Sequence, residues 1–172
     1  LWFMDHLSQI PPGALQTDPL PECWTSLAAI ASCTTRIKLG SMVTAASLRP
    51  PSMLAKITAT VDNISNGRLI VGIGSGWVEW EHKAYGLHFP PIGVRLKRLE
   101  ETILILKQMW THEYSTFEGE YFRIQDAVCN PKPLQKPHPP LLIGGRGEKV
   151  TLRIVAQHAQ AYNTISDPPE VY

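Results

Sequence analysis

The segment LWFMDH at the start of the chain ends in an aspartate and a histidine, Asp5 and His6. Its apolar start is typical of a buried strand, so both polar residues lie where that strand ends. A histidine there is suited to exchange a proton with a substrate near neutral pH, and its neighbour is suited to accept a hydrogen bond from a cofactor ring. The pattern alone favours a simpler interpretation, a surface histidine beside an aspartate that caps the next loop.

A second candidate site is the run RLIVGIGSGW, an apolar strand that breaks into glycines at Gly72, Gly74 and Gly76. A dinucleotide-binding fingerprint requires G-x-G-x-x-G, followed by another strand with an acidic end. Trp77 stands at the third glycine position and no such strand follows closely, so that fingerprint fails. The sequence around Ser75 also differs from the G-x-S-x-G elbow of hydrolases. The glycines indicate either a softened strand end or the close approach of a flat ligand.

The segment IGGRGEKV is the strongest candidate for a phosphate site. Gly144, Gly145 and Gly147 lie between an apolar strand and a helix that we expect to start near Glu148. Backbone N–H groups in such a turn, together with the positive end of the helix, are able to converge on an anion, and Arg146 would add a countercharge. An ordinary strand-to-helix turn is the alternative.

Neither the cysteines nor the other histidines have the spacing of metal ligands or of a catalytic triad. We therefore expect free thiols, no metal site, and histidines that are mostly solvated. The residues concerned are Cys23, Cys33, Cys129, His82, His88, His112, His138 and His158.

The composition excludes several classes of function. The 172 residues are 44% hydrophobic and 18% charged, with a formal net charge of +1, which is typical of one globular domain and offers no basic face for nucleic acid. No apolar run is long enough to span a membrane, and the N-terminus has no features of a signal peptide. These features predict a cytoplasmic protein without a nucleic-acid or membrane partner.

The elements that position these candidates alternate between strand and helix. Apolar spacing and start or stop residues predict helices at 21–32, 50–66, 77–86, 93–110 and 148–159, and strands at 1–5, 37–43, 68–74, 141–144 and 161–165. A small hairpin, STFEGEYFRI, and a proline-rich segment lie within an insertion at about 111–140.

This alternation predicts parallel strands joined by helical crossovers. A doubly wound sheet and a (β/α)₈ barrel are the two candidate architectures. A complete barrel needs about 250 residues, so the barrel interpretation requires missing strands. The chain starts inside a strand and stops without a closing element, and we therefore expect residues 1–172 to be a single partial domain of a longer chain.

Several segments together resemble the luciferase-like monooxygenases and their deazaflavin-dependent relatives, which are (β/α)₈ barrels. The segments that carry the resemblance are MDHL, RIKLGSMVTAASLRPPSMLAK, ISNGRLIVGIGSGWVEWEHKAYG, FPPIGVRLKRLEETILILKQMW, TFEGEYFRI, PKPLQKPHPPLLIGGRGEK and HAQAYN. The DH pair and the motif G-W-x-x-x-E resemble the branch that uses coenzyme F420. The resemblance implies an incomplete barrel that contains about strands 2 to 6.

The same resemblance implies roles for individual residues. His6 would be the proton-transfer residue, and Asp5 would face the deazaflavin. Ser41 and Met42 would correspond to a strand bulge where the family often has a non-proline cis peptide behind the ring. The remaining cofactor contacts would be Thr44, Ser75 and Gly76 at the ring and ribityl chain, and Gly144, Gly145 and Gly147 at the phosphate.

The implied reaction is hydride transfer between F420 and a small organic substrate. In the sugar-phosphate dehydrogenase branch an acidic residue follows the G-x-G turn, whereas this sequence has Trp77, so oxidation of a sugar phosphate is not expected. An FMN-dependent monooxygenase is the alternative enzyme, and an inactive, truncated flavin-binding relative is the alternative outside catalysis. For the full-length protein we expect a homodimer.

Overall fold

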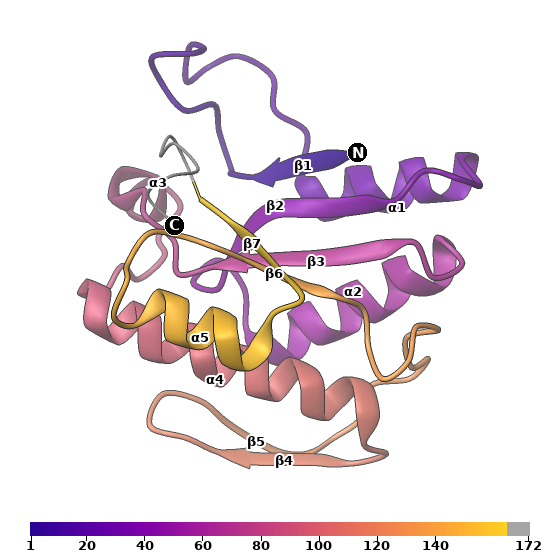
Figure 1. Ribbon diagram of the computed structural model, residues 1–172. Coiled ribbons are helices and arrows are strands. Elements are labelled where there is room, and N and C mark those ends of the chain that lie inside the picture. Colours follow the sequence, from indigo (N-terminus) through magenta and orange to yellow (C-terminus); the bar gives the residue numbers. More distant parts are fainter. Residues whose placement is uncertain (165–172) are drawn as a thin grey trace.

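The computed structural model describes residues 1–164, and its main feature is a parallel sheet (Figure 1). Within these residues the sheet has the order β1-β2-β3-β6-β7, and every neighbouring pair is parallel. Its strands are β1 (Trp2–Asp5), β2 (Leu39–Ala45), β3 (Leu69–Gly74), β6 (Leu141–Gly144) and β7 (Ala161–Asn163). The predicted alternation of parallel strands and helical crossovers is confirmed.

Four of the five helices within residues 1–164 pack apolar side chains into the core beside the sheet. The five helices are α1 (Cys23–Cys33), α2 (Pro51–Ile64), α3 (Glu79–Ala84), α4 (Ile92–Thr111) and α5 (Thr151–His158). The short α3 lies at the strand ends. The predicted apolar stripes are the buried ones: Trp24 and Leu27 are buried on α1, and Leu106 and Trp110 are buried on α4. These side chains join the strands in one hydrophobic core.

Two helix ends illustrate how local chemistry sets the boundaries. Proline occupies the first position of α2, where its missing N–H costs nothing, and the chain leaves that helix through Gly67 with a φ of +76°. The start of α5 differs from the prediction, because this helix begins at Thr151 rather than near Glu148. Gly145 and Gly147, with φ values of +148° and +140°, are incompatible with a helix and delay its first turn.

Strand β2 contains the irregularity that the family resemblance implied. The pairing of β2 with β3 shifts between Gly40 and Thr44, so β2 carries one extra residue there, and the peptide bond Met42–Val43 is cis. The bulge is tied to β3 by the buried hydroxyl of Ser41, which donates to the carbonyl oxygen of Gly72 at 2.8 Å and accepts from its amide at 3.2 Å. The predicted bulge and cis peptide are confirmed.

The glycines of β3 and β6 make room for this bulge. A Cβ on Gly72 would lie 1.9 Å from the carbonyl oxygen of Ser41, and one on Gly144 would lie 2.9 Å from the side chain of Val43. A Cβ on Gly74 would lie 3.0 Å from Val43. These three glycines therefore serve the packing of neighbouring strands.

The insertion between α4 and β6 contains the predicted hairpin. Its strands are β4 (Ser115–Glu118) and β5 (Arg123–Ala127), which pair in antiparallel fashion. The carboxylate of Glu101 on α4 accepts backbone N–H bonds from the turn at residues 120–122. Figure 1 shows the hairpin beside α4, on the side away from the sheet. It is therefore remote from the candidate site residues.

The last predicted strand lies partly outside the described residues. Residues 161–163 form β7, whereas Ile165 lies beyond residue 164. Among the described helices, none combines the length and the apolar character needed to cross a bilayer.

Candidate functional site

The candidate residues gather at one edge of the sheet because all five strands run in the same direction. His6 follows β1, Thr44 lies near the end of β2, Ser75 and Gly76 follow β3, and Gly145 follows β6. The carboxyl ends of parallel strands form the ligand-binding edge of α/β folds. The sequence-predicted candidates thus share the edge where such a site is expected.

Asp5 forms a buried ion pair. Its carboxylate is 2% exposed and accepts two hydrogen bonds from Arg49, at 2.6 and 3.0 Å. Burial alone would lower the pKa of Arg49, but hydrogen bonds and the charges of Asp5 and Glu22 raise that pKa above its ordinary value. Asp5 is therefore not the cap of the next loop. Its carboxylate oxygens are already engaged by the protein, and its contact with a cofactor stays a prediction.

His6 is held by a carboxylate that the sequence analysis did not assign. Its Nδ1 lies 3.1 and 3.3 Å from the two oxygens of Glu81, and the backbone N–H of Leu7 donates to Glu81 Oε1 at 2.6 Å. Glu81 is 1% exposed. Burial on its own would raise the pKa of this carboxyl, but the hydrogen bonds from His6 and Leu7 lower it below the ordinary value. Glu81 ends the motif G-W-x-x-x-E, which was the available signal.

His82 was expected to be solvated, and this prediction is wrong. Its side chain is 1% exposed, with Nδ1 2.7 Å from the carbonyl oxygen of Val78 and Nε2 2.7 Å from the hydroxyl of Ser47. Since a carbonyl oxygen only accepts, Nδ1 carries a proton and Nε2 accepts from Ser47 in the neutral ring. Gly76 lies over this pair with a φ of +78°, and a Cβ there would lie 2.7 Å from Ser47 Oγ.

The other residues predicted to contact the cofactor ring differ in whether their polar atoms have hydrogen-bond partners. The hydroxyl of Ser41 is fully used by Gly72, whereas the hydroxyl of Thr44 is buried and has no partner within residues 1–164. Register places Thr44 opposite Ile73, in the row that also contains Asp5. Met42 and Ser75 are half-buried. The cofactor contacts of all these residues stay predictions.

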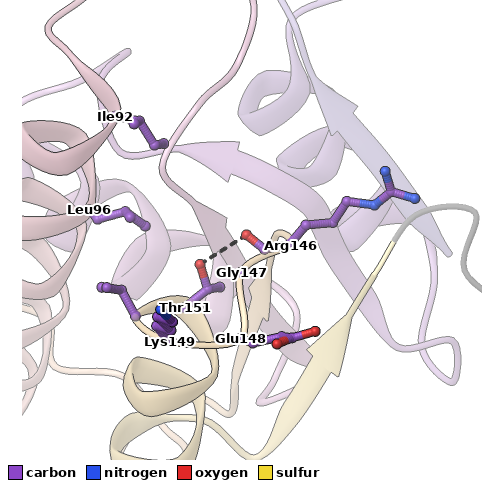
Figure 2. Close-up of a pocket in the computed structure, with 8 residues that line it drawn as sticks. Ile92, Leu96, Arg146, Gly147, Glu148, Lys149 and Thr151 are labelled. Carbon is purple, nitrogen blue, oxygen red and sulfur yellow. Dashed lines mark hydrogen bonds between the residues drawn. The ribbon is translucent and has the colours of Figure 1, made fainter. Parts of the chain in front are cut away.

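The glycine loop, residues 144–150, borders a surface hollow of about 540 Å³. Figure 2 shows Ile92 and Leu96 of α4 on one side of the hollow and residues of the loop on the other. Of the three predicted phosphate glycines only Gly147 lines it. The N–H of Gly145 already donates to the carbonyl oxygen of Asn163 at 3.1 Å.

Two side-chain hydroxyls bind backbone oxygens of this loop. The hydroxyl of Thr151 donates to the carbonyl oxygen of Arg146 at 3.2 Å, as Figure 2 shows, and the hydroxyl of Tyr162 donates to the carbonyl oxygen of Gly145 at 2.8 Å. Arg146, Lys149 and Glu148 bring two positive charges and one negative charge to the rim. The arrangement is suited to a small anionic group.

Within residues 1–164, no three His, Cys, Asp or Glu side chains are close enough to hold a metal ion. The three cysteines are free thiols, and Cys23 and Cys129 are buried. Burial raises the pKa of both buried thiols, so neither resembles a reactive thiolate.

The comparisons with known proteins agree with this architecture. A model of the luciferase-like monooxygenase family matches residues 1–172. The chain is 34% identical over 152 residues to an F420-dependent glucose-6-phosphate dehydrogenase of Kineococcus radiotolerans, covering 88% of this chain and 43% of that protein. It is 40% identical over 95 residues to an FMNH₂-dependent dimethylsulfone monooxygenase of Pseudomonas putida, covering 55% of this chain and 26% of that protein.

A solved structure of an F420-dependent secondary alcohol dehydrogenase has a TM-score of 0.85 and 23% sequence identity, covering 99% of this chain and 50% of that protein. This chain therefore spans half or less of the length of these proteins. The likeness confirms the predicted fold class, in which the parallel sheet is part of a (β/α)₈ barrel. Because the family model matches throughout, the chain belongs to the luciferase-like monooxygenase family.

Proposed function

We propose that the protein is an F420-dependent oxidoreductase that transfers a hydride between the deazaflavin and a small organic substrate. The observation that carries the proposal is His6, which lies at the carboxyl edge of the sheet with Nδ1 held by Glu81. Its side chain is 19% exposed, and within residues 1–164 nothing hydrogen-bonds its Nε2. A histidine with one nitrogen anchored and the other open is suited to exchange a proton with a substrate.

The residues present fit a deazaflavin or a flavin in two places. The buried, unpartnered hydroxyl of Thr44 is suited to a ligand hydrogen bond, because such a group is costly when left unsatisfied. The hollow beside Gly147, with Arg146 and Lys149 at its rim, is suited to a phosphate. Ser75, Gly76 and the bulge at Ser41 and Met42 would form the ring side.

Each part of the chain has a defined task in this proposal. The bound deazaflavin supplies hydride exchange at its C5 position. The glycine loop holds the phosphate at Gly147, while Gly144 and Gly145, predicted as further phosphate contacts, shape the start of the loop. The strand ends orient the ring and exclude water. His6 takes a proton from the substrate hydroxyl during oxidation, or returns it during reduction. Asp5, through Arg49, fixes the end of β1 from which His6 extends.

An FMN-dependent monooxygenase is the second candidate. It is favoured by the 40% identity over 95 residues to the dimethylsulfone monooxygenase, which is FMNH₂-dependent. Oxidation of a sugar phosphate is not proposed, because Trp77 occupies the position after the G-x-G turn and is 63% exposed. The ring of Trp77 lies edge-on to His6, with a centroid distance of 6.0 Å, where it would border the substrate.

Cofactor titration separates the two candidates. The protein expressed from its complete gene is titrated with F420 and, separately, with FMN, and binding is followed by fluorescence quenching. We expect tighter binding of F420. Submicromolar binding of FMN together with no binding of F420 would overturn the proposal in favour of the monooxygenase, and binding of neither would contradict both enzyme candidates.

The catalytic role of His6 is tested by His6→Ala, with His112→Ala as the matched control because that histidine is exposed at the far end of α4. Loss of a general acid or base reduces turnover by about 10²–10⁴-fold. We expect such a loss for His6→Ala and none for His112→Ala. Unchanged turnover in His6→Ala would contradict the assigned role.

We also propose that the substrate is a small molecule, that the protein acts in the cytoplasm, and that the full-length protein is a homodimer. Light scattering of the protein from the complete gene tests the last point. A mass that corresponds to one chain at micromolar concentration would contradict it.

A further inference from the structure

The short helix α3 connects the ends of three strands. It follows β3 directly, its Glu81 binds the segment after β1, and its His82 binds Ser47 after β2. The hydroxyl of Tyr85, just beyond the helix, also donates to the carbonyl oxygen of Leu7 at 2.7 Å. The position of His6 is therefore set by α3 as well as by its own strand.

Within residues 1–164, the buried carboxylate of Glu81 forms an ion pair with a histidine and with no lysine or arginine. Both of its oxygens lie within 3.3 Å of His6 Nδ1, the N–H of Leu7 donates to it at 2.6 Å, and the backbone of Ser8 also hydrogen-bonds it. Among the residues of the described chain, His6 is its ion-pair partner. A buried carboxylate needs donors from its surroundings, so this site requires a proton on His6 Nδ1.

A proton on Nδ1 of His6 decides which of its two ring nitrogens is able to act as a base. With the proton on Nδ1, the neutral imidazole presents a lone pair at Nε2, and Nε2 is the nitrogen that no described residue binds. A ring with the opposite tautomer would turn a lone pair toward the carboxylate. Such a tautomer would offer an N–H where a base is required.

We propose that Glu81 is a positioning residue that fixes His6 as the Nδ1–H tautomer and directs Nε2 toward the substrate. The consequence for turnover depends on the function proposed above, because it requires His6 to exchange a proton with the substrate. The tautomer itself does not depend on that function.

The direct test is the ¹⁵N NMR spectrum of the histidine rings in the protein from the complete gene. The signals of His6 are identified by their loss in His6→Ala. We expect His6 of the wild-type protein to show the shift pattern of the Nδ1–H tautomer when it is neutral. A neutral His6 with the proton on Nε2 would overturn the proposal, and this measurement needs no variant of Glu81.

The variant Glu81→Gln tests whether Glu81 is what holds His6 in the Nδ1–H tautomer. The amide keeps the shape of the side chain but loses the charge and brings its own donor group toward Nδ1, so we expect the His6 signals to move toward the Nε2–H pattern. Glu79→Gln is the matched control, since Glu79 lies on the same helix and is exposed. His6 signals that are unchanged in Glu81→Gln would overturn the proposal.

Kinetics of the same variants complete the test. We expect Glu81→Gln to lower kcat by about tenfold or more and to leave the Kd of the cofactor within about twofold. We expect Glu81→Asp, which keeps the carboxylate, to restore part of the lost kcat. A cofactor that binds normally with an unchanged kcat would contradict the positioning role. If neither F420 nor FMN bound the wild-type protein, the proposed function would fail while the NMR result would still decide the tautomer.

Discussion

Two parts of the same sheet edge are built in different ways. At the first, which we call the α3 junction, buried and half-buried side chains at the ends of β1, β2 and β3 are joined in pairs: Asp5 to Arg49, His6 to Glu81, and His82 to Ser47. At the second, the glycine loop, residues 146–150 are exposed, and the hydroxyls of Thr151 and Tyr162 donate to backbone oxygens of the loop. The first depends on the identity of its side chains, and the second on backbone conformation.

The difference follows from what each part is proposed to hold. Proton transfer requires one atom in one place, which is achieved by desolvated charges with fixed partners. A phosphate accepts several N–H bonds from a backbone that bends around it. We therefore expect substitutions at the α3 junction to affect stability strongly, and substitutions in the glycine loop to affect ligand binding more than stability.

The largest effect is expected at Asp5. Asp5→Ala leaves the half-buried guanidinium of Arg49 without its bidentate partner and with Glu22 as its remaining carboxylate, so we expect a loss of at most about 3–5 kcal/mol, the cost of breaking a buried pair. Urea unfolding measures this loss. Glu118→Ala is the control, because its ion pair with Arg123 is exposed and contributes little. Equal losses in both variants would remove the contrast between a buried and an exposed ion pair.

The next largest effect is a difference in stability between alanine variants of two glycines, Gly76 and Gly86, that both have a positive φ. Gly86, with a φ of +68°, has nothing within 4 Å of an added Cβ, so Gly86→Ala should cost only the backbone term, about 1–2 kcal/mol. Gly76→Ala should cost about 1 kcal/mol more, because Ser47 must move and its bond to His82 weakens. Thermal unfolding of both variants checks the order. A smaller loss for Gly76→Ala would mean that the α3 junction yields without cost.

In the glycine loop we expect a smaller effect on stability. Thr151→Val removes the hydroxyl that bonds to the carbonyl oxygen of Arg146, which is worth about 0.5–1.5 kcal/mol. If the loop binds phosphate, the Kd of the cofactor should rise by a larger factor than this loss of stability suggests. Thr60→Val, on the exposed side of α2, is the control for a valine in a helix. Normal cofactor binding in Thr151→Val would place the phosphate elsewhere.

The smallest expected effect is a loss of folding stability at acidic pH. The pKa of Glu81 is lowered in the folded protein, so this carboxyl stabilises the fold above its ordinary value of 4.5, and the contribution is lost as the pH falls through the folded pKa. Between about pH 5 and pH 3 the wild-type protein should lose more stability than Glu81→Gln does. Identical pH profiles would show that Glu81 is not an anchor of the α3 junction.

Much of the fold was predictable because its signals are local. Helices such as α4 show their buried faces at the spacing Leu99, Ile103, Leu106 and Trp110, and the alternation of elements predicted the parallel sheet. The bulge in β2 came from the resemblance of SMVTAASLRPP to the family and not from periodicity.

The side-chain partners were not predictable because they join residues far apart in the sequence. Arg49 lies 44 residues from Asp5, and Glu81 lies 75 residues from His6. No periodicity relates such positions, and the burial of His82 depends on Ser47, which is 35 residues away. The late start of α5 depends on the positive φ angles of Gly145 and Gly147, which the amino-acid sequence of the loop did not specify.

Gly144 illustrates how a glycine in a candidate phosphate motif can have a different role. Its missing side chain is explained by the side chain of Val43, which lies 2.9 Å from where a Cβ would be. Selection acting on this pair would therefore preserve Gly144 even in a protein that had lost its cofactor. Alanine at position 144 would become acceptable only after Val43 had been replaced by a smaller residue. The two positions would then change together during divergence, and their covariation would record the shape of the barrel interior, not phosphate recognition.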